Sequence, residues 1–134
     1  MNFTINILSA LLIFAASFNA NAIKTLESTE KTAILKFETE IIDYGTIKQN
    51  SDGKRIVEFT NEGDAPLIIT NVRPSCGCTV ANYTKDPIAP GKSGQIEVGY
   101  DTRRIGAFNK SVTVTSNAEG GNKTLRIKGV VVAE

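Results

Sequence analysis

The sequence predicts an all-β protein, an antiparallel β-sandwich of about seven or eight short strands. Segments rich in β-branched and aromatic residues recur about every 8–12 residues, and glycine, proline, asparagine and aspartate separate them, as is typical of a sandwich. Most of these segments alternate apolar and polar residues, which indicates strands with one buried face. No long helical pattern interrupts the 134 residues, so one domain over residues 33–134 is expected.

The first 22 residues are expected to be a signal peptide that precedes this domain. They contain no Asp, Glu, Lys or Arg, residues 5–18 are mostly apolar, and the Ala-Asn-Ala sequence ending at Ala22 suits signal peptidase. Cleavage is predicted after Ala22, although the region before the apolar run lacks Lys and Arg. A retained anchor is the alternative, but the apolar run is shorter than the about 20 residues of a bilayer span. We therefore expect an exported protein, periplasmic or secreted, with no stable membrane span after cleavage.

Charge and residue content exclude several function classes. The chain has 15 basic and 14 acidic residues and a net charge of +1, which gives no electrostatic attraction for nucleic acid. It has no His, so a serine nucleophile has no histidine base. No set of acid, base and nucleophile is visible, and an enzyme is not expected.

The first strand region follows a polar spacer at residues 23–32. Residues 34–42 mix β-branched, aromatic and charged side chains, and residues 43–47 continue the pattern. Gly45 within this run predicts either a β-bulge or a crossing from one sheet to the other.

A hairpin and a second strand come next. The Asp-Gly pair at 52–53 is a strong hairpin signal. Residues 55–60 alternate, so Val57 and Phe59 are expected to face inward. Residues 61–66, N-E-G-D-A-P, predict a turn.

The middle of the chain contains the most apolar run, residues 67–72, which Pro74 is expected to end. A short strand is predicted at 79–83. The segment 85–93 holds two prolines and a glycine and predicts a corner between strands.

The last third of the chain alternates most clearly. Residues 94–100 place Ile96, Val98 and Tyr100 on one face. Residues 101–109 are expected to be a connection, followed by strand residues 110–115, a hairpin turn at 117–123 and a final strand at 124–132. The inward positions of these two strands are expected to be Val112, Val114, Leu125 and Ile127.

Six stretches now carry a family resemblance: D-Y-G-T-I at 43–47, F-T-N-E-G-D-A-P-L at 59–67, N-V-R-P-S-C-G-C-T at 71–79, I-A-P-G-K-S-G at 88–94, V-T-V-T-S-N at 112–117 and L-R-I-K-G at 125–129. In this order and spacing they resemble the bacterial domain-of-unknown-function 1573 family, with Tyr44 where the family usually has Phe. The resemblance covers about residues 37–132. It implies an Ig-like sandwich of about seven strands, similar to PapD-like and major-sperm-protein domains, in an exported protein. It implies no activity.

Cys76 and Cys78, separated only by Gly77, are the main candidate site, and four interpretations stay open. In an exported protein the pair is expected to form a disulfide, a local staple whose bend Gly77 permits. A reducible thiol–disulfide site is the second interpretation, since Arg73 nearby favours a thiolate, although the C-x-x-C spacing of thioredoxin-like enzymes is absent. A soft-metal site is the third interpretation, although the chain expected after cleavage has no His or Met to complete it. Free thiols in the core are the fourth.

Two other segments carry weaker signals. Residues 89–93 share G-K-S with phosphate-binding loops, but the rest of that pattern and a following helix are missing, so a turn is predicted. The charged connection 101–109 is interpreted by default as a solvated loop. Its alternative is a binding rim made of Arg103, Arg104, Phe108 and Lys110.

The predicted function is that of a binding or scaffolding module that contacts another envelope or secreted protein through its loops or a sheet edge. No cofactor is expected. The alternative is a thiol-redox or soft-metal-binding protein that uses the Cys76-Gly77-Cys78 loop. The candidate binding residues are Arg73, Cys76, Gly77, Cys78, Arg103, Arg104 and Phe108.

Overall fold

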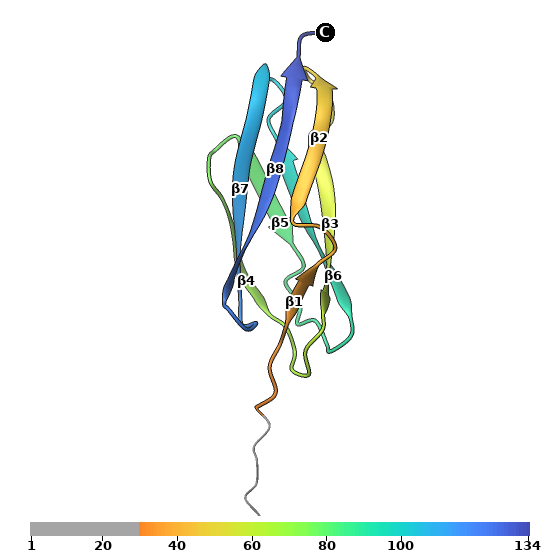
Figure 1. Ribbon diagram of the computed structural model, residues 1–134, viewed down its shortest axis with the longest axis vertical. Helices are drawn as coiled ribbons and strands as arrows, with labels where there is room; N and C mark the ends of the chain where they lie inside the picture. Colours follow the sequence, from red (N-terminus) through yellow and green to blue (C-terminus); the bar gives the residue numbers. More distant parts are fainter. Residues whose placement is uncertain (1–29) are drawn as a thin grey trace, which may run out of the picture.

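The computed structural model describes residues 30–134, which form a β-sandwich of two four-stranded sheets (Figure 1). The strands are β1 Leu35–Phe37, β2 Ile41–Lys48, β3 Lys54–Asn61, β4 Ile69–Pro74, β5 Thr79–Tyr83, β6 Ser93–Tyr100, β7 Gly106–Ser116 and β8 Asn122–Val132. The predicted all-β sandwich is confirmed. The predicted signal peptide, with its cleavage site at Ala22, and spacer residues 23–29 lie outside the described residues. Residues 30–134 contain no helix long and apolar enough to cross a bilayer.

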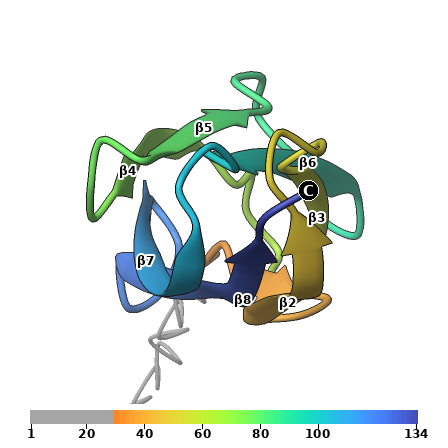
Figure 2. The ribbon, with the colours of Figure 1, turned by 90° about the horizontal axis from the view of Figure 1, so that it is seen from above.

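The two sheets lie face to face as opposing layers (Figure 2). One has the strand order β1-β3-β6-β5 and the other the order β2-β8-β7-β4. All neighbouring strands within residues 30–134 are antiparallel except β2 and β8, which run parallel. This is the strand arrangement of an Ig-like sandwich in which the first strand is divided between the two sheets.

The parallel pair arises because residues 34–42, predicted as one continuous segment, form the end of one strand and the start of the next. The Glu38 N–H donates to Glu58 O of β3 at 3.0 Å, and the Arg126 N–H of β8 donates to Glu40 O at 2.8 Å. The chain therefore leaves one sheet and joins the other within three residues.

Gly45 marks a bulge in β2, which is the first of its two predicted alternatives. Its φ is +62°, a conformation that glycine adopts without steric cost. The register between β2 and β8 shifts between Asp43 and Thr46, as an extra residue in one strand requires. The crossing between sheets takes place before this bulge and not at it.

The core lies between the layers and consists of the side chains that alternation placed inward. These residues are almost fully buried: Val57, Phe59, Ile96 and Val98 from one sheet, and Val112, Val114, Leu125 and Ile127 from the other. The rings of Phe37 and Phe59 meet edge to face, with centroids 6.4 Å apart.

β7 begins at Gly106, which shortens the predicted connection 101–109. Residues 106–109 pair with the end of β8, from Gly106 opposite Val131 to Asn109 opposite Lys128, and this pairing turns Phe108 into the core. Phe108 is 5% exposed, and its ring stacks on Tyr100 with centroids 3.8 Å apart. The assignment of Phe108 to a surface rim is therefore corrected.

The turn predicted at residues 61–66 is built around a buried amide. Asn61 is fully buried at the end of β3, and its side chain bonds four main-chain groups. Leu67 and Ile88 then form an isolated bridge with two 2.8 Å hydrogen bonds. The N-E-G-D-A-P sequence is thus explained by the fold alone.

Candidate functional site

The loop between β4 and β5 passes from one sheet to the other near the end of the sandwich where β6 and β8 finish (Figure 1). Within it Cys76 and Cys78 form a disulfide, with Cα atoms 5.3 Å apart, as the first interpretation of this pair expects. Gly77 is exposed, and a Cβ atom placed on it would have no neighbour within 4 Å. Cys78 is buried and Cys76 is partly exposed, so the disulfide ring is open to solvent on one side.

Main-chain hydrogen bonds hold both sides of this ring independently of the sulfur atoms. The Ser75 N–H donates to Ser111 O of β7, and the Asp101 N–H donates to Cys78 O, each at 2.8 Å. By the chain-entropy relation, a disulfide that closes so short a loop contributes about 1.6 kcal/mol, against about 3 kcal/mol for a 15-residue loop. The staple therefore adds little to an anchorage that hydrogen bonds already provide.

A hollow of about 520 Å³ lies beside the disulfide on the outer face of the β1-β3-β6-β5 sheet. Its floor is Gly99 of β6, which stands opposite Val80 of β5 on one side and Lys54 of β3 on the other. A Cβ atom on Gly99 would come within 3.1 Å of a Val80 methyl group. Gly99 is itself buried between the Val80 and Lys54 side chains. The missing side chain at position 99 leaves the depression between them, with Gly77 and Cys78 on its disulfide side.

Two loops that close the far side of the hollow are tied to each other. The buried Thr102 hydroxyl donates to Ser51 O at 2.6 Å, and the Asn50 N–H donates to Thr102 O at 3.2 Å. The Gln49 side chain donates to Arg103 O at 3.1 Å. The wall is therefore held in one shape by bonds between segments about 50 residues apart.

An ion-pair cluster sits at the mouth of the hollow. The Arg103 guanidinium donates two hydrogen bonds to the Asp101 carboxylate, at 2.8 and 3.0 Å, and Arg104 lies 3.7 Å from the same carboxylate. The hydrogen bond from Arg103, with smaller contributions from both arginine charges, lowers the pKa of Asp101 to about 2. Asp101 stays ionised at physiological pH, and Arg103 is held in place while its outer edge stays exposed.

Not all the residues singled out from the sequence meet here. Gly77, Cys78 and Arg103 line the hollow, and Arg104 shares the turn of Arg103. Arg73 lies on β4 opposite Thr113, with its side chain exposed and outside the hollow. No ion pair within residues 30–134 includes Arg73.

Val80 and Gly99 are parts of this site that the sequence interpretation missed. The alternation that places Ile96, Val98 and Tyr100 inward also places residue 99 outward, so a signal for an outward glycine was present. Its meaning depends on the two neighbouring strands, because only their register places Val80 and Lys54 beside it.

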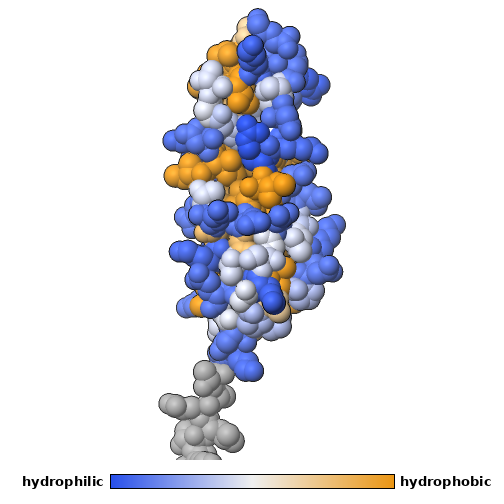
Figure 3. Space-filling model, turned by 90° about the vertical axis from the view of Figure 1, so that its right-hand side faces the viewer, coloured by the Kyte–Doolittle hydropathy of each residue, from blue (hydrophilic) through white to orange (hydrophobic). Residues whose placement is uncertain are grey.

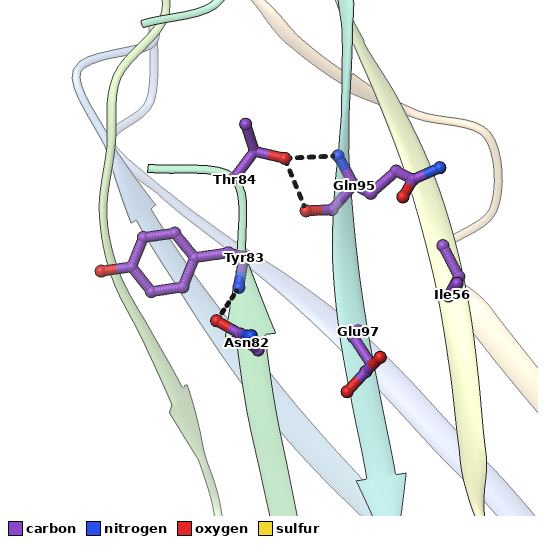
Figure 4. Close-up of a pocket in the computed structure, with 6 residues that line it drawn as sticks. All are labelled: Ile56, Asn82, Tyr83, Thr84, Gln95 and Glu97. Atoms are coloured by element: carbon purple, nitrogen blue, oxygen red, sulfur yellow. Dashed lines mark hydrogen bonds between the residues drawn. The ribbon is translucent and has the colours of Figure 1, made fainter. Parts of the chain in front are cut away.

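A second, smaller hollow of about 230 Å³ lies lower on the same sheet face and is mostly polar (Figure 4). The Thr84 hydroxyl donates to Gln95 O at 3.3 Å and accepts from the Gln95 N–H at 3.1 Å. The Tyr83 ring points away from Ile56, and its hydroxyl donates to Thr70 O of β4 at 3.2 Å. These contacts fasten the end of β5 to β6 and to the opposite sheet, which is a structural role.

The side of the molecule where β2 and β3 lie carries a band of hydrophobic side chains across its upper half, between hydrophilic ones (Figure 3). The exposed large apolar residues of these two strands are Ile41 and Ile56. Between the sheets on this side, the Arg55 guanidinium lies 4.4 Å from the centre of the Tyr44 ring, and the Tyr44 hydroxyl donates to Gly53 O at 2.7 Å. The gap between the layers is therefore closed here, and the hydroxyl that distinguishes Tyr44 from phenylalanine has its own partner.

No group of three or more His, Cys, Asp or Glu side chains in the described part of the chain is arranged to hold a metal ion. The two sulfur atoms are bonded to each other, whereas a metal would require them as thiolates.

Residues 35–131 match the family described as protein of unknown function, DUF1573. No curated protein matches the chain. Among solved structures, the chain is similar to a protein of unknown function from Porphyromonas gingivalis W83, with a TM-score of 0.68 and 17% identity over 75% of this chain. It spans about half, 47%, of that protein's length.

The chain is also similar to two further solved structures, a PapD-like domain and a chaperone. PapD-like domain 7 of human CEP192 has a TM-score of 0.61 at 8% identity, covering 77% of this chain and 88% of the domain. The YadV chaperone has a TM-score of 0.51 at 14% identity, covering 75% of this chain and 52% of the chaperone. At these identities the likeness concerns the fold alone, and it agrees with the PapD-like sandwich that the sequence resemblance implied.

Proposed function

This chain belongs to the DUF1573 family of proteins of unknown function, and we propose that it is an exported binding module that contacts another envelope or secreted protein through the hollow beside its disulfide. One observation carries the proposal: the outer face of β6, a central strand, bears a glycine between an exposed valine and a lysine. Glycine weakens a strand and often marks a place where a ligand or another backbone approaches closely. A partner segment that lies over position 99 would explain why this position of a central strand is a glycine.

The chemistry of the hollow suits a protein partner. Val80 is 68% exposed and offers an apolar contact at the centre, while Lys54 and Arg103 supply charge at the edge. Protein interfaces commonly combine a desolvated apolar centre with a polar rim. The bonded loops behind the hollow keep its shape before binding, which lowers the entropy lost on association.

The strand that borders the hollow also offers free main-chain groups. The Asp101 N–H donates to Cys78 O, so Cys78 occupies a hydrogen-bonded position of the ladder between β5 and β6. Val80 and Asn82 follow at steps of two residues and therefore also direct their main-chain N–H and C=O towards β6. Ladder alternation then directs the N–H and C=O of Ala81 away from the sheet. A partner that extends from the hollow across Val80 to the free edge of β5 has a donor and an acceptor at Ala81 for strand addition.

Other edges of the sandwich are less suited to strand addition. β1 is three residues long, and β2 is interrupted by the bulge at Gly45. β4 contains a register shift and ends at Pro74, which has no N–H to donate. Short strands, bulges and prolines are the usual protection against edge pairing. This contrast favours β5 as the edge that meets a partner.

The experiment that tests the proposal is site-specific photo-crosslinking in native envelopes. A photoreactive residue replaces Val80 in one variant and Val130, on the opposite sheet, in the control. We expect a defined adduct from position 80 and none from position 130. The same adduct should disappear when Gly99→Val fills the floor of the hollow, while circular dichroism of the purified variant remains that of the wild type. Equal adducts from both positions, or an adduct that Gly99→Val does not change, would refute the site.

Export is tested separately. Intact mass of the protein recovered from the periplasm or the medium should correspond to a chain that begins at Ile23, because the predicted cleavage follows Ala22. A chain that keeps residues 1–22 and sediments with membranes would show that the segment is an anchor instead.

A further inference from the structure

We propose that the Cys76–Cys78 disulfide is a thiol-exchange site that accepts two electrons from a dithiol protein of the envelope, with Cys76 as the sulfur that is attacked. This activity is separate from the binding proposed above, and either can fail alone. It starts from the observation that main-chain hydrogen bonds hold Ser75 and Cys78 in place, so the loop does not depend on the disulfide for its anchorage. A disulfide that the fold does not need is free to open and close.

The two sulfur atoms differ in access. Cys78 borders the hollow but is only 5% exposed and belongs to the core cluster, whereas Cys76 is partly exposed. The exposed Gly77 beside them leaves open space around the ring. A thiolate from another protein therefore reaches Cys76 more readily than Cys78, and access is one of the factors that set which sulfur is attacked.

A buried hydroxyl is placed to receive the thiolate that leaves. Thr79 is 3% exposed, and its hydroxyl oxygen lies 3.9 Å from the sulfur of Cys76 and 3.9 Å from that of Cys78. No oxygen or nitrogen atom within residues 30–134 forms a hydrogen bond with this hydroxyl. A buried hydroxyl without a stronger partner is unusual, and sulfur accepts a hydrogen bond better as a thiolate than in a disulfide. The geometry therefore favours a reduced state in which Thr79 donates to the Cys78 thiolate.

The exchange proceeds in two balanced steps. The first thiolate of the partner attacks the Cys76 sulfur, the bond between Cys76 and Cys78 breaks, and Cys78 leaves as a thiolate, which gives a mixed disulfide through Cys76. The second thiolate of the partner then attacks the partner's first sulfur in the mixed disulfide. The bond between that sulfur and Cys76 breaks, and Cys76 leaves as a thiolate. The partner ends with a disulfide, and this chain has gained two electrons and, from the partner's two thiols, two protons.

A trapping experiment tests the assignment. The full chain is incubated with a thioredoxin whose second active-site cysteine is replaced by serine, so that the reaction stops at the mixed disulfide. We expect an adduct whose peptide mass maps to Cys76, and complete reduction of the chain by unmodified thioredoxin. The Cys76→Ser variant, which has no disulfide to attack, is the control and should give no adduct. An adduct at Cys78, or none above the control, would overturn the proposal.

The role of Thr79 needs a readout of its own. Thr79→Val removes the hydroxyl at nearly constant volume and should slow adduct formation about tenfold, while Thr79→Ser keeps the hydroxyl and should react at nearly the wild-type rate. Equal rates in all three proteins would overturn this role. Thiolate absorbance at 240 nm in the reduced proteins is a second measurement. The thiolate should form at lower pH in the wild type and in Thr79→Ser than in Thr79→Val, because the hydroxyl donor offsets the burial that disfavours the charged sulfur, and equal titration curves would overturn the role.

Discussion

Asn61, at the end of β3, is the buried polar residue whose removal should cost the fold most. Its amide nitrogen donates to Ala65 O at 2.7 Å and to Ile88 O at 3.0 Å, and its amide oxygen accepts from Gly63 N–H at 3.0 Å and from Ile34 N–H at 3.3 Å. These bonds join the segment before β1, the turn after β3 and the corner before β6. We therefore predict that Asn61→Ala destabilises the domain strongly.

The magnitude follows from the bonds lost. Each of the four hydrogen bonds contributes about 1 kcal/mol. Main-chain groups that stay buried without a partner add a desolvation cost, and groups that water can reach reduce it. The free energy of unfolding should therefore fall by about 3–5 kcal/mol. That is a large share of the about 5–15 kcal/mol that holds a typical domain together. Asn117 is a matched control, because its amide also bonds two main-chain groups, Ile68 N–H at 2.7 Å and Pro66 O at 2.9 Å, but is exposed. Asn117→Ala should cost about 1 kcal/mol, since water replaces its bonds.

Urea unfolding followed by circular dichroism measures both variants, and it suits a chain without tryptophan. The midpoint for Asn61→Ala should fall by about 2–3 M, whereas that for Asn117→Ala should fall by less than about 1 M. Equal shifts in the two variants would show that burial of the Asn61 amide is not what matters, and that the turn is held by its main chain alone.

Three further predictions concern the disulfide and the aromatic core. The double variant C76S/C78S should lower the free energy of unfolding by no more than about 1.6 kcal/mol in the same urea assay, and a loss above about 3 kcal/mol would restore the staple as a major source of stability. Burial raises the pKa of Tyr44 from 10.0 to about 12, although the Arg55 charge opposes the shift. As pH rises, Tyr44 therefore ionises in the unfolded state before it ionises in the folded state. The neutral Tyr44 should contribute about 1–2 kcal/mol to the free energy of unfolding, allowing for solvent screening, and this contribution should be complete below pH 10 and lost as pH rises towards 12. Tyr44→Phe should remove this step from the pH profile of stability. Phe108→Ala should lower the free energy of unfolding by about 3–5 kcal/mol, as expected for an aromatic ring in the core. A loss below about 1 kcal/mol would show that the Phe108 side chain lies at the surface.

Much of the fold was predictable because its signals are local. Alternation placed Val57, Phe59, Ile96 and Val98 inward, and it does so wherever a strand has one wet face and one dry face. Turn residues marked the ends of the strands for a similar reason, since glycine and asparagine accept backbone conformations that other residues resist.

The division of the first strand was not predictable in this way. Residues on both sides of Glu38–Glu40 have the same texture, and either half would pair with any edge that is available. What separates them is the partner: β1 pairs with β3, whereas β2 pairs with β8 near the far end of the chain. Phe108 was misplaced for the same reason, because polar neighbours suggested a loop, while its burial depends on the length of β8 and on the rings of Tyr44 and Tyr100.

The hollow beside the disulfide shows why a binding surface on a sheet is harder to predict than the core beneath it. The inward side chains of a strand are selected by one requirement, burial, which leaves a periodic trace within that strand alone. An outer-face site is composed across strands: Val80, Gly99 and Lys54 are distant in the sequence and become neighbours only through the register of β5, β6 and β3. A single outward glycine is the only part of such a site that one strand can display. In an antiparallel sandwich, a glycine at an outward position of a central strand is therefore worth examining for binding before any cluster of charged loop residues.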